Sequence, residues 1–205
     1  MMLGKEQLAA LTTLFCRGAE QATRALSVWL GRPARLSIEE VEQVPLAAAT
    51  EVLGDGENPV CFCAMALEGR LSGELILAFD DASGLALADL VQEQSLGHAT
   101  HWGEIEISAA LETANIIGCA YLNALAPAMP GAGGEVPPLL PSPPRFARDF
   151  AESLLQFALM SQAIESDVAF LTQSEFEVEN APVHCKLLFI PDAASLAVLQ
   201  ELLPE

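Results

Sequence analysis

The chain is poor in positive charge. Lysine and arginine account for 9 of its 205 residues, against 28 aspartates and glutamates, which gives a net charge of −19. Nucleic acids and anionic membrane surfaces are bound through clustered lysine and arginine side chains. The imbalance therefore predicts no nucleic-acid and no membrane partner. It leaves two interpretations open: a protein partner with a positively charged patch, or an acidic surface that serves solubility alone.

A secretory leader and long apolar runs are also missing. The first residues lack a basic start followed by a sustained apolar stretch, so we expect no signal peptide. No run of about 18 uninterrupted apolar residues predicts a membrane-spanning helix. The five cysteines are scattered through apolar segments, which fits reduced core thiols better than a disulfide framework. They are Cys16, Cys61, Cys63, Cys119 and Cys185. These features predict a cytoplasmic protein.

Residues for metal or small-molecule chemistry are scarce. Cys61 and Cys63 are too closely spaced for a zinc knuckle, and the nearest histidines, His98 and His101, are remote in sequence. No glycine-rich phosphate loop or nucleophile elbow is present either. We therefore expect no metal site and no cofactor of the protein's own, and we expect both histidines to be loop residues.

The chain contains 52% apolar residues, arranged in two similar halves. In the first half, the periodicity predicts a helix over residues 7–30, a hairpin of strands over 60–67 and 71–79, and a helix over about 84–94. In the second half, it predicts helices over residues 104–125 and 148–162, strands over 167–178 and 183–190, and a leucine-rich terminal helix. The proline-rich segment 126–144 between them is predicted to be a surface loop.

Two passages make the repeat concrete: LILAFDDASGLAL in the first half and KLLFIPDAASLAV in the second. Each is an apolar strand, an acidic turn and the start of a helix. We therefore predict a single domain over residues 1–205, with repeat halves of about 5–95 and 104–205. The predicted class is α+β, a pseudo-twofold duplication in which two long helices pack on one shared, mainly antiparallel sheet.

The stretch SAALETANIIGCAYLNAL in the second long helix carries polar residues at a regular spacing. Ser108, Glu112 and Asn115 stand at positions i, i+4 and i+7, so they form one stripe along the helix. Spacing alone leaves two hypotheses open: a solvated face of an amphipathic helix, or a functional site.

That stretch resembles the signature helix of the CheC, CheX and FliY family of chemotaxis phosphatases. The family pattern is Asp or Ser, three residues, Glu, two residues, Asn, then twenty-two residues and Pro. Ser108, Glu112, Asn115 and Pro138 occupy its four positions. The flanking residues NIIG and YLNAL also resemble a CheC helix, and the likeness extends over most of the chain.

The resemblance implies a hydrolase that acts on another protein. Family members speed hydrolysis of the aspartyl phosphate on a CheY-like response-regulator receiver in two-component signalling, and the receiver supplies the aspartate, the Mg²⁺ and a lysine. By analogy, Asn115 orients the attacking water and Glu112 pairs with that lysine. Ser108 caps or braces the start of the helix, and Pro138 directs the path of the chain.

One half departs from the family pattern. When the two long helices are aligned at their Ala-Leu pairs, Ala9, Thr13 and Cys16 fall where Ser108, Glu112 and Asn115 stand. The resemblance therefore implies a single active site. Two further hypotheses remain: a non-catalytic binding module for a receiver or a CheD-like deamidase, and a flagellar switch component similar to FliY.

Overall fold

The structure is a computed structural model that describes residues 2–53, 57–128, 139–153, 156, 168–178 and 181–203. The first half contains α1 (Lys5–Leu30), β1 (Ala34–Ile38), β2 (Glu42–Pro45), α2 (Leu46–Leu53), β3 (Val60–Glu68), β4 (Gly73–Asp80) and α3 (Asp81–Val91). The second half contains α4 (Glu104–Leu125), the 3₁₀ turn η1 (Ala126–Ala128), β5 (Leu140–Pro141), β6 (Arg145–Asp149), β7 (Val168–Val178), β8 (Ala181–Pro191) and α6 (Ala193–Leu202).

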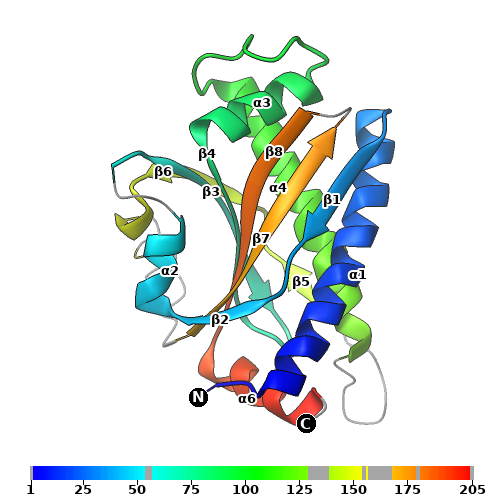
Figure 1. The fold of residues 1–205 in the computed structure, drawn as a ribbon, viewed down its shortest axis with the longest axis vertical. Helices are drawn as coiled ribbons and strands as arrows, with labels where there is room; N and C mark the ends of the chain where they lie inside the picture. The colour runs from blue at the N-terminus through cyan, green and yellow to red at the C-terminus, as the bar shows by residue number, and fades with distance from the viewer. Residues whose placement is uncertain are drawn as a thin grey trace.

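One eight-stranded sheet runs through both halves, in the order β1-β7-β8-β4-β3-β5, with β2 also paired to β7 and β6 to β3 (Figure 1). Every strand pair within the described residues is antiparallel. The arrangement is symmetric about the central β4–β8 pair, where Ile76 lies opposite Leu188. The predicted α+β class and the shared antiparallel sheet are confirmed.

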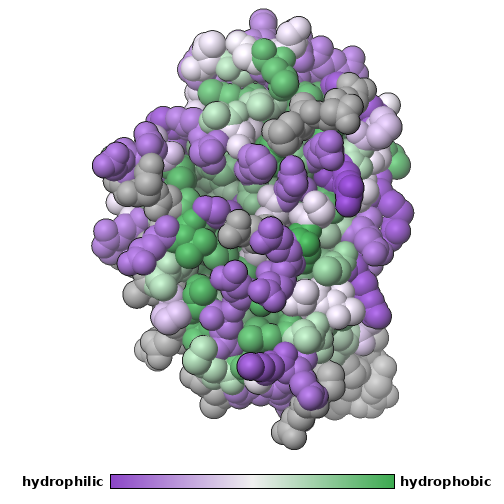
Figure 2. Space-filling model, viewed as in Figure 1, coloured by the Kyte–Doolittle hydropathy of each residue, from purple (hydrophilic) through white to green (hydrophobic). Residues whose placement is uncertain are grey.

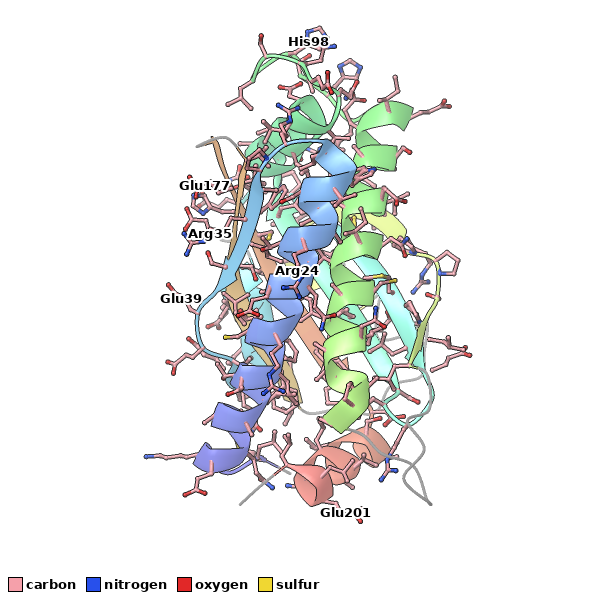
Figure 3. All side chains as sticks on the ribbon, turned by 90° about the vertical axis from the view of Figure 1, so that its right-hand side faces the viewer. Arg24, Arg35, Glu39, His98, Glu177 and Glu201 are labelled. Atoms are coloured by element: carbon pink, nitrogen blue, oxygen red, sulfur yellow. The ribbon has the colours of Figure 1, made fainter. Side chains whose placement is uncertain are left out.

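The long helices α1 and α4 pack side by side on one face of the sheet (Figures 1 and 3). Phe15 and Tyr121 meet edge to face between them, with ring centroids 5.2 Å apart. Gly18 allows this approach, because a Cβ there would lie 2.7 Å from a ring carbon of Tyr121. Burial of such a continuous apolar face is the main favourable term for a layered fold.

The starts of the two helices are capped in the same way. The backbone N–H of Gly4 donates to Oε1 of Gln7 at 2.9 Å, and that of Gly103 donates to Oε2 of Glu106 at 3.0 Å. Gly4 and Gly103 are separated by the same number of residues as the two Ala-Leu pairs by which the helices were aligned in sequence. The structure therefore supports the correspondence of Ala9, Thr13 and Cys16 with the polar stripe of α4.

The opposite face of the sheet is covered less completely. A smaller apolar cluster beside α2 includes Phe62, Ile76 and Leu188, all buried. Hydrophilic and hydrophobic residues are interspersed over this face (Figure 2), and Arg35 and Glu177 project from it, away from the long helices (Figure 3). Among the described residues, the stretch Glu104–Ala128 is long and apolar enough to cross a membrane, but half of its apolar window is buried within the fold.

The structure corrects three predicted boundaries. Helix α3 begins at Asp81 rather than near residue 84, because Asp80 caps it by accepting from the N–H of Ser83 at 2.7 Å. Arg148 belongs to strand β6 rather than to a helix, because it pairs with Cys61 of β3; residues 151–153 are helical, and most of the predicted helix 148–162 lies outside the described residues. Within the predicted loop 126–144, a short turn and β5 are formed.

Candidate functional site

The predicted polar stripe lies on the solvent side of α4. Ser108 and Glu112 are exposed and Asn115 is half-buried. Ala114 and Ile117 lie on the other side of the helix and are buried in the core. The helix therefore directs its apolar residues to the sheet and leaves a carboxylate and a carboxamide one turn apart beside solvent.

The stripe forms one wall of an open groove of about 440 Å³. The other wall is built by the segment that enters β6, and the lining residues are Ser108, Leu111, Glu112, Asn115, Pro141, Ser142, Pro143 and Pro144. We name this the α4 groove. Leu111 of the same helix is half-buried and contributes an apolar surface to the groove.

The proline wall is fixed to the edge of β3. The N–H of Ser142 donates to the carbonyl of Ala66 at 2.8 Å, and the N–H of Ala66 donates back to Oγ of Ser142 at 3.0 Å. Pro141 also pairs with Leu67. Because proline has no N–H to donate and a restricted φ, this segment suits an edge position. The groove is thus bounded by a helix and an anchored strand, which limits its freedom to collapse.

The side chain of Asn115 accepts a hydrogen bond from its own helix. The thiol of Cys119, one turn further along α4, donates to Oδ1 of Asn115 at 3.7 Å. Burial, followed by the negative charge of Glu112, raises the pKa of the Cys119 thiol. Sequence analysis missed this contact, although the i, i+4 spacing of Asn115 and Cys119 is a signal that could have found it.

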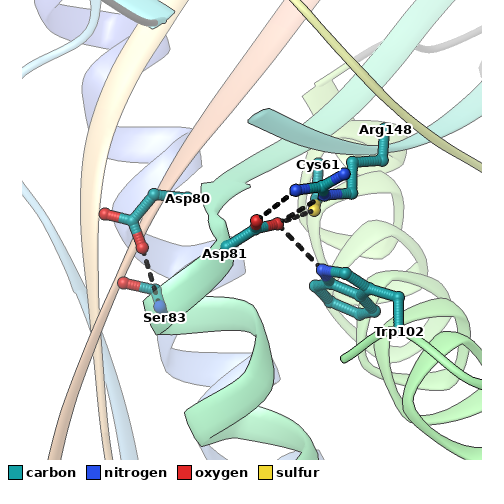
Figure 4. A network of polar contacts seen from close by, with 6 residues as sticks. All are labelled: Cys61, Asp80, Asp81, Ser83, Trp102 and Arg148. Atoms are coloured by element: carbon teal, nitrogen blue, oxygen red, sulfur yellow. Dashed lines mark hydrogen bonds and ion pairs between the residues drawn. The ribbon is translucent and has the colours of Figure 1, made fainter. Parts of the chain in front are cut away.

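A polar cluster holds the start of α4 against the sheet (Figure 4). Arg148 of β6 binds the carboxylate of Asp81 through two bonds of 2.7 and 2.5 Å. Trp102, directly before α4, donates its indole N–H to the same carboxylate at 2.9 Å, and the Cys61 thiol donates at 3.4 Å. The Arg148 guanidinium, helped by the Trp102 and Cys61 bonds, lowers the pKa of Asp81 to about 2.

The loop between α3 and α4 is organised by a buried carboxylate. Asp89 is fully buried and accepts backbone N–H groups from Gly97 at 2.7 Å, His98 at 3.0 Å and Ala99 at 2.8 Å. His98 and His101 lie in this loop as predicted, with His101 exposed. Figure 3 shows His98 at the end of the molecule. Neither histidine lines the α4 groove.

A second groove of about 520 Å³ lies at the equivalent place on α1. Its lining includes Ala9 and Thr12 of the helix and residues 40–43 of the segment around β2. Thr13 and Cys16 do not line this groove, but both are exposed, so Cys16 is not the core thiol that the sequence predicts. Cys61, Cys63 and Cys185 are buried as free thiols. This groove overlaps the position of the α4 groove at Ala9 and Thr12, which correspond to Ser108 and Leu111, and no glutamate or asparagine of α1 lines it.

The structure thus brings Ser108, Glu112 and Asn115 together in one groove. Pro138, the fourth predicted site residue, lies outside the described residues. Leu139 follows it and is buried, one residue before β5.

No family model matches the chain. Its fold is similar to that of solved structures that cover it almost completely. FliY of Thermotoga maritima is 18% identical, with 99% of this chain and 98% of that chain covered and a TM-score of 0.77. The FliM middle domain of H. pylori is 12% identical, with 97% and 99% covered and a TM-score of 0.70. CheX of Desulfovibrio desulfuricans is 11% identical, with 88% and 98% covered and a TM-score of 0.51. The chain has the fold that FliY, the FliM middle domain and CheX share.

Proposed function

We propose that this protein is a phosphatase that accelerates hydrolysis of the aspartyl phosphate on a CheY-like receiver domain. The observation that carries the proposal is the α4 groove, where the carboxylate of Glu112 and the carboxamide of Asn115 lie one turn apart beside solvent. Both side chains are within reach of a second protein. The signature of the family that this helix resembles requires these two residue types at this spacing.

The proposed mechanism depends on positioning. Asn115 enters the pocket of the receiver and orients a water molecule in line with the phosphorus atom, and Glu112 pairs with a lysine of the receiver to fix the register of the two proteins. Phosphoryl transfer depends mainly on in-line placement and charge stabilisation, so two such groups suffice without a nucleophile of the enzyme. The groove offers one carboxylate, which is a poor cage for Mg²⁺, and the metal ion is the receiver's own.

The test is the decay rate of a phosphorylated CheY-like receiver, measured with and without the protein. Asn115→Ala should lower kcat by about 10²–10³, the usual effect of losing one preorganised polar group, while binding of the phosphorylated receiver persists. Thr13→Ala, at the position in α1 that corresponds to Glu112, is the matched control and should retain full activity. Normal activity of the Asn115→Ala protein would rule out the assignment.

Binding without turnover is the second candidate function. The second groove, on α1, is lined by no glutamate or asparagine of that helix, and the fold is also that of the FliM middle domain. FliM of H. pylori has been solved in complexes with FliG and with SpeE. On this hypothesis the partner is a receiver or a CheD-like deamidase in the cytoplasm. A receiver that binds the protein but keeps its intrinsic rate of dephosphorylation would favour it.

A further inference from the structure

We infer that Cys119 is a positioning residue for Asn115, an assignment that rests on the function proposed above. The observation is the hydrogen bond in which Sγ of Cys119 donates to Oδ1 of Asn115 at 3.7 Å. The α4 groove is lined by Asn115 but not by Cys119. Cys119 therefore contacts the reactive amide from behind, without reaching the space that a receiver would occupy.

The bond selects one orientation of the amide. The last torsion of an asparagine side chain is broad and nearly two-fold, so the oxygen and the nitrogen can exchange places at little cost when nothing distinguishes them. A thiol favours the oxygen, because its S–H donates to Oδ1, whereas towards the NH₂ group the sulfur can act only as a weak acceptor. With Oδ1 turned to Cys119, Nδ2 is directed away from it, since both atoms are bonded to the same carbon.

The remaining hydrogen-bonding capacity matches the proposed chemistry. The thiol occupies one of the two lone pairs on Oδ1, so the other remains for a proton of the attacking water. The two N–H groups of Nδ2 remain as donors to a phosphoryl oxygen. An amide that is already turned in this way pays no reorganisation cost when the receiver docks, which is the source of catalytic benefit from preorganised polar groups.

The environment of Cys119 suits this role. The side chain is half-buried, and burial together with the charge of Glu112 keeps the sulfur protonated, as a donor must be. In α1 the residue at the equivalent position is Glu20, four residues after Cys16. The helix that lacks the amide therefore also lacks the thiol that would orient it.

The experiment compares Cys119→Ala, Cys119→Ser and Cys119→Val in the full chain, with decay of a phosphorylated CheY-like receiver as the readout. The alanine and valine variants remove the donor, and valine, with two γ carbons, fills the space that the sulfur leaves. Both should lower kcat by about 2- to 10-fold, as expected for the loss of one hydrogen bond, with KM unchanged. Serine keeps a donor and should restore kcat to near the wild-type value. Cys16→Ala is the control and should leave both constants unchanged.

Three outcomes would overturn the assignment: wild-type kcat in the valine variant, equal loss in the serine and valine variants, or an effect confined to KM. Thermal unfolding of each variant measures its stability. Where alanine lowers the stability of the fold, the valine variant shows the effect of losing the donor. Failure of the proposed function is recognised separately: either the wild-type protein leaves the decay rate of the receiver unchanged, or the Asn115→Ala protein is as active as the wild type.

Discussion

At the residue scale, the thiol of Cys119 reports the charge at the proposed site. Burial, and after it the carboxylate of Glu112, raises the pKa of this thiol. Glu112→Gln removes the negative charge, so the pKa of Cys119 should fall and its thiolate fraction at a given pH should rise. Because the thiolate is the nucleophile, alkylation by iodoacetamide should then become faster.

The measurement is the pH profile of Cys119 alkylation, followed by mass spectrometry in a Cys16→Ser background that removes the exposed thiol. Glu104→Gln, an exposed acidic residue at the far end of α4, is the matched control. An unchanged profile in Glu112→Gln would mean that the carboxylate does not act on this thiol.

The two walls of the α4 groove differ in how far sequence could predict them. Ser108, Glu112 and Asn115 follow from helical periodicity, because positions i, i+4 and i+7 must share a face wherever the helix forms. The proline wall does not follow from any local pattern. Ser142 reaches its place through Ala66 of β3, which is remote in sequence. A site assembled by strand pairing requires the register of the sheet, which no local spacing specifies.

At the scale of elements, the Asp81 cluster ties α3, β6 and the start of α4 together. Asp81 has a pKa of about 2 in the folded protein, below its ordinary value of 3.8. The group therefore contributes stability that is present above about pH 4 and is lost as the pH falls towards 2. The side chains of Asp81 and Arg148 are 36% and 41% exposed, so solvent screening limits the contribution to about 1 kcal/mol.

Arg148→Ala should remove most of this pH-dependent part. The variant should be less stable than the wild type at pH 5, and the difference should shrink towards zero at pH 2. Urea unfolding midpoints at pH 5, 4, 3 and 2 measure the effect, with Arg35→Ala on β1 as the control. Parallel loss of stability in the wild type and Arg148→Ala across this range would contradict the role given to the ion pair.

Helix α4 also presents an apolar residue beside the site. Ile105 is 62% exposed and lies three residues before Ser108, on the same stripe. We predict that Ile105 contacts the docked receiver. Complete burial of one aliphatic side chain at the interface would stabilise the complex by about 1.5–3 kcal/mol. Ile105→Ser should raise KM for the phosphorylated receiver several-fold and leave kcat unchanged.

The matched control for Ile105 is Val28→Ser. Val28 is 83% exposed near the end of α1 and does not line the α4 groove. Equal effects of the two substitutions on KM would show that Ile105 does not contact the partner.

The elements differ in how clearly the sequence indicates them. The bounds of α4 were predicted correctly, because a long apolar stripe is flanked by capping residues. Strands β1 and β2 and helix α2 were not predicted. The residues of β2 do not alternate between buried and exposed positions, and none of the four is fully buried. Strand β6 was not predicted, and its last two residues were taken for the start of a helix, because edge strands with exposed, charged residues lack the alternation by which strands are recognised.

At the scale of the whole molecule, each half completes the sheet of the other. Strands β1 and β2 of the first half pair only with β7 among the described strands, and β5 and β6 of the second half pair only with β3. The repeat itself was visible in the sequence. The pairing of strands between the halves was not visible, because both halves carry the same local pattern. Such a pattern does not specify with which copy of a strand a given strand pairs.

This pairing between the halves predicts that neither half is stable alone. A fragment of residues 1–103 would leave β1 and β2 without β7 and would expose the apolar faces of β4 and α1. A fragment of residues 104–205 would likewise lose β3, β4 and the contact in which Gln7 donates to the carbonyl of Gln200 at 2.8 Å. Strand pairs that are cut off from their sheet are marginal in water. Each fragment should therefore exchange its amide hydrogens rapidly and unfold without a cooperative transition.

Mixed in equal amounts, the two fragments should form a one-to-one complex that regains slow exchange in β4 and β8, the central pair of the sheet. The break between them falls directly before α4, after the loop held by Asp89, so no hydrogen bond of that loop to Asp89 is severed. The recombined complex should also regain the phosphatase activity proposed for the intact chain, since the α4 groove needs α4 from one fragment and nothing covalent from the other. The proline wall of the groove, however, needs β3 of the first fragment to hold Ser142 in place. Cooperative unfolding of either fragment alone, with slow exchange in its strands, would show instead that the halves are independent folding units.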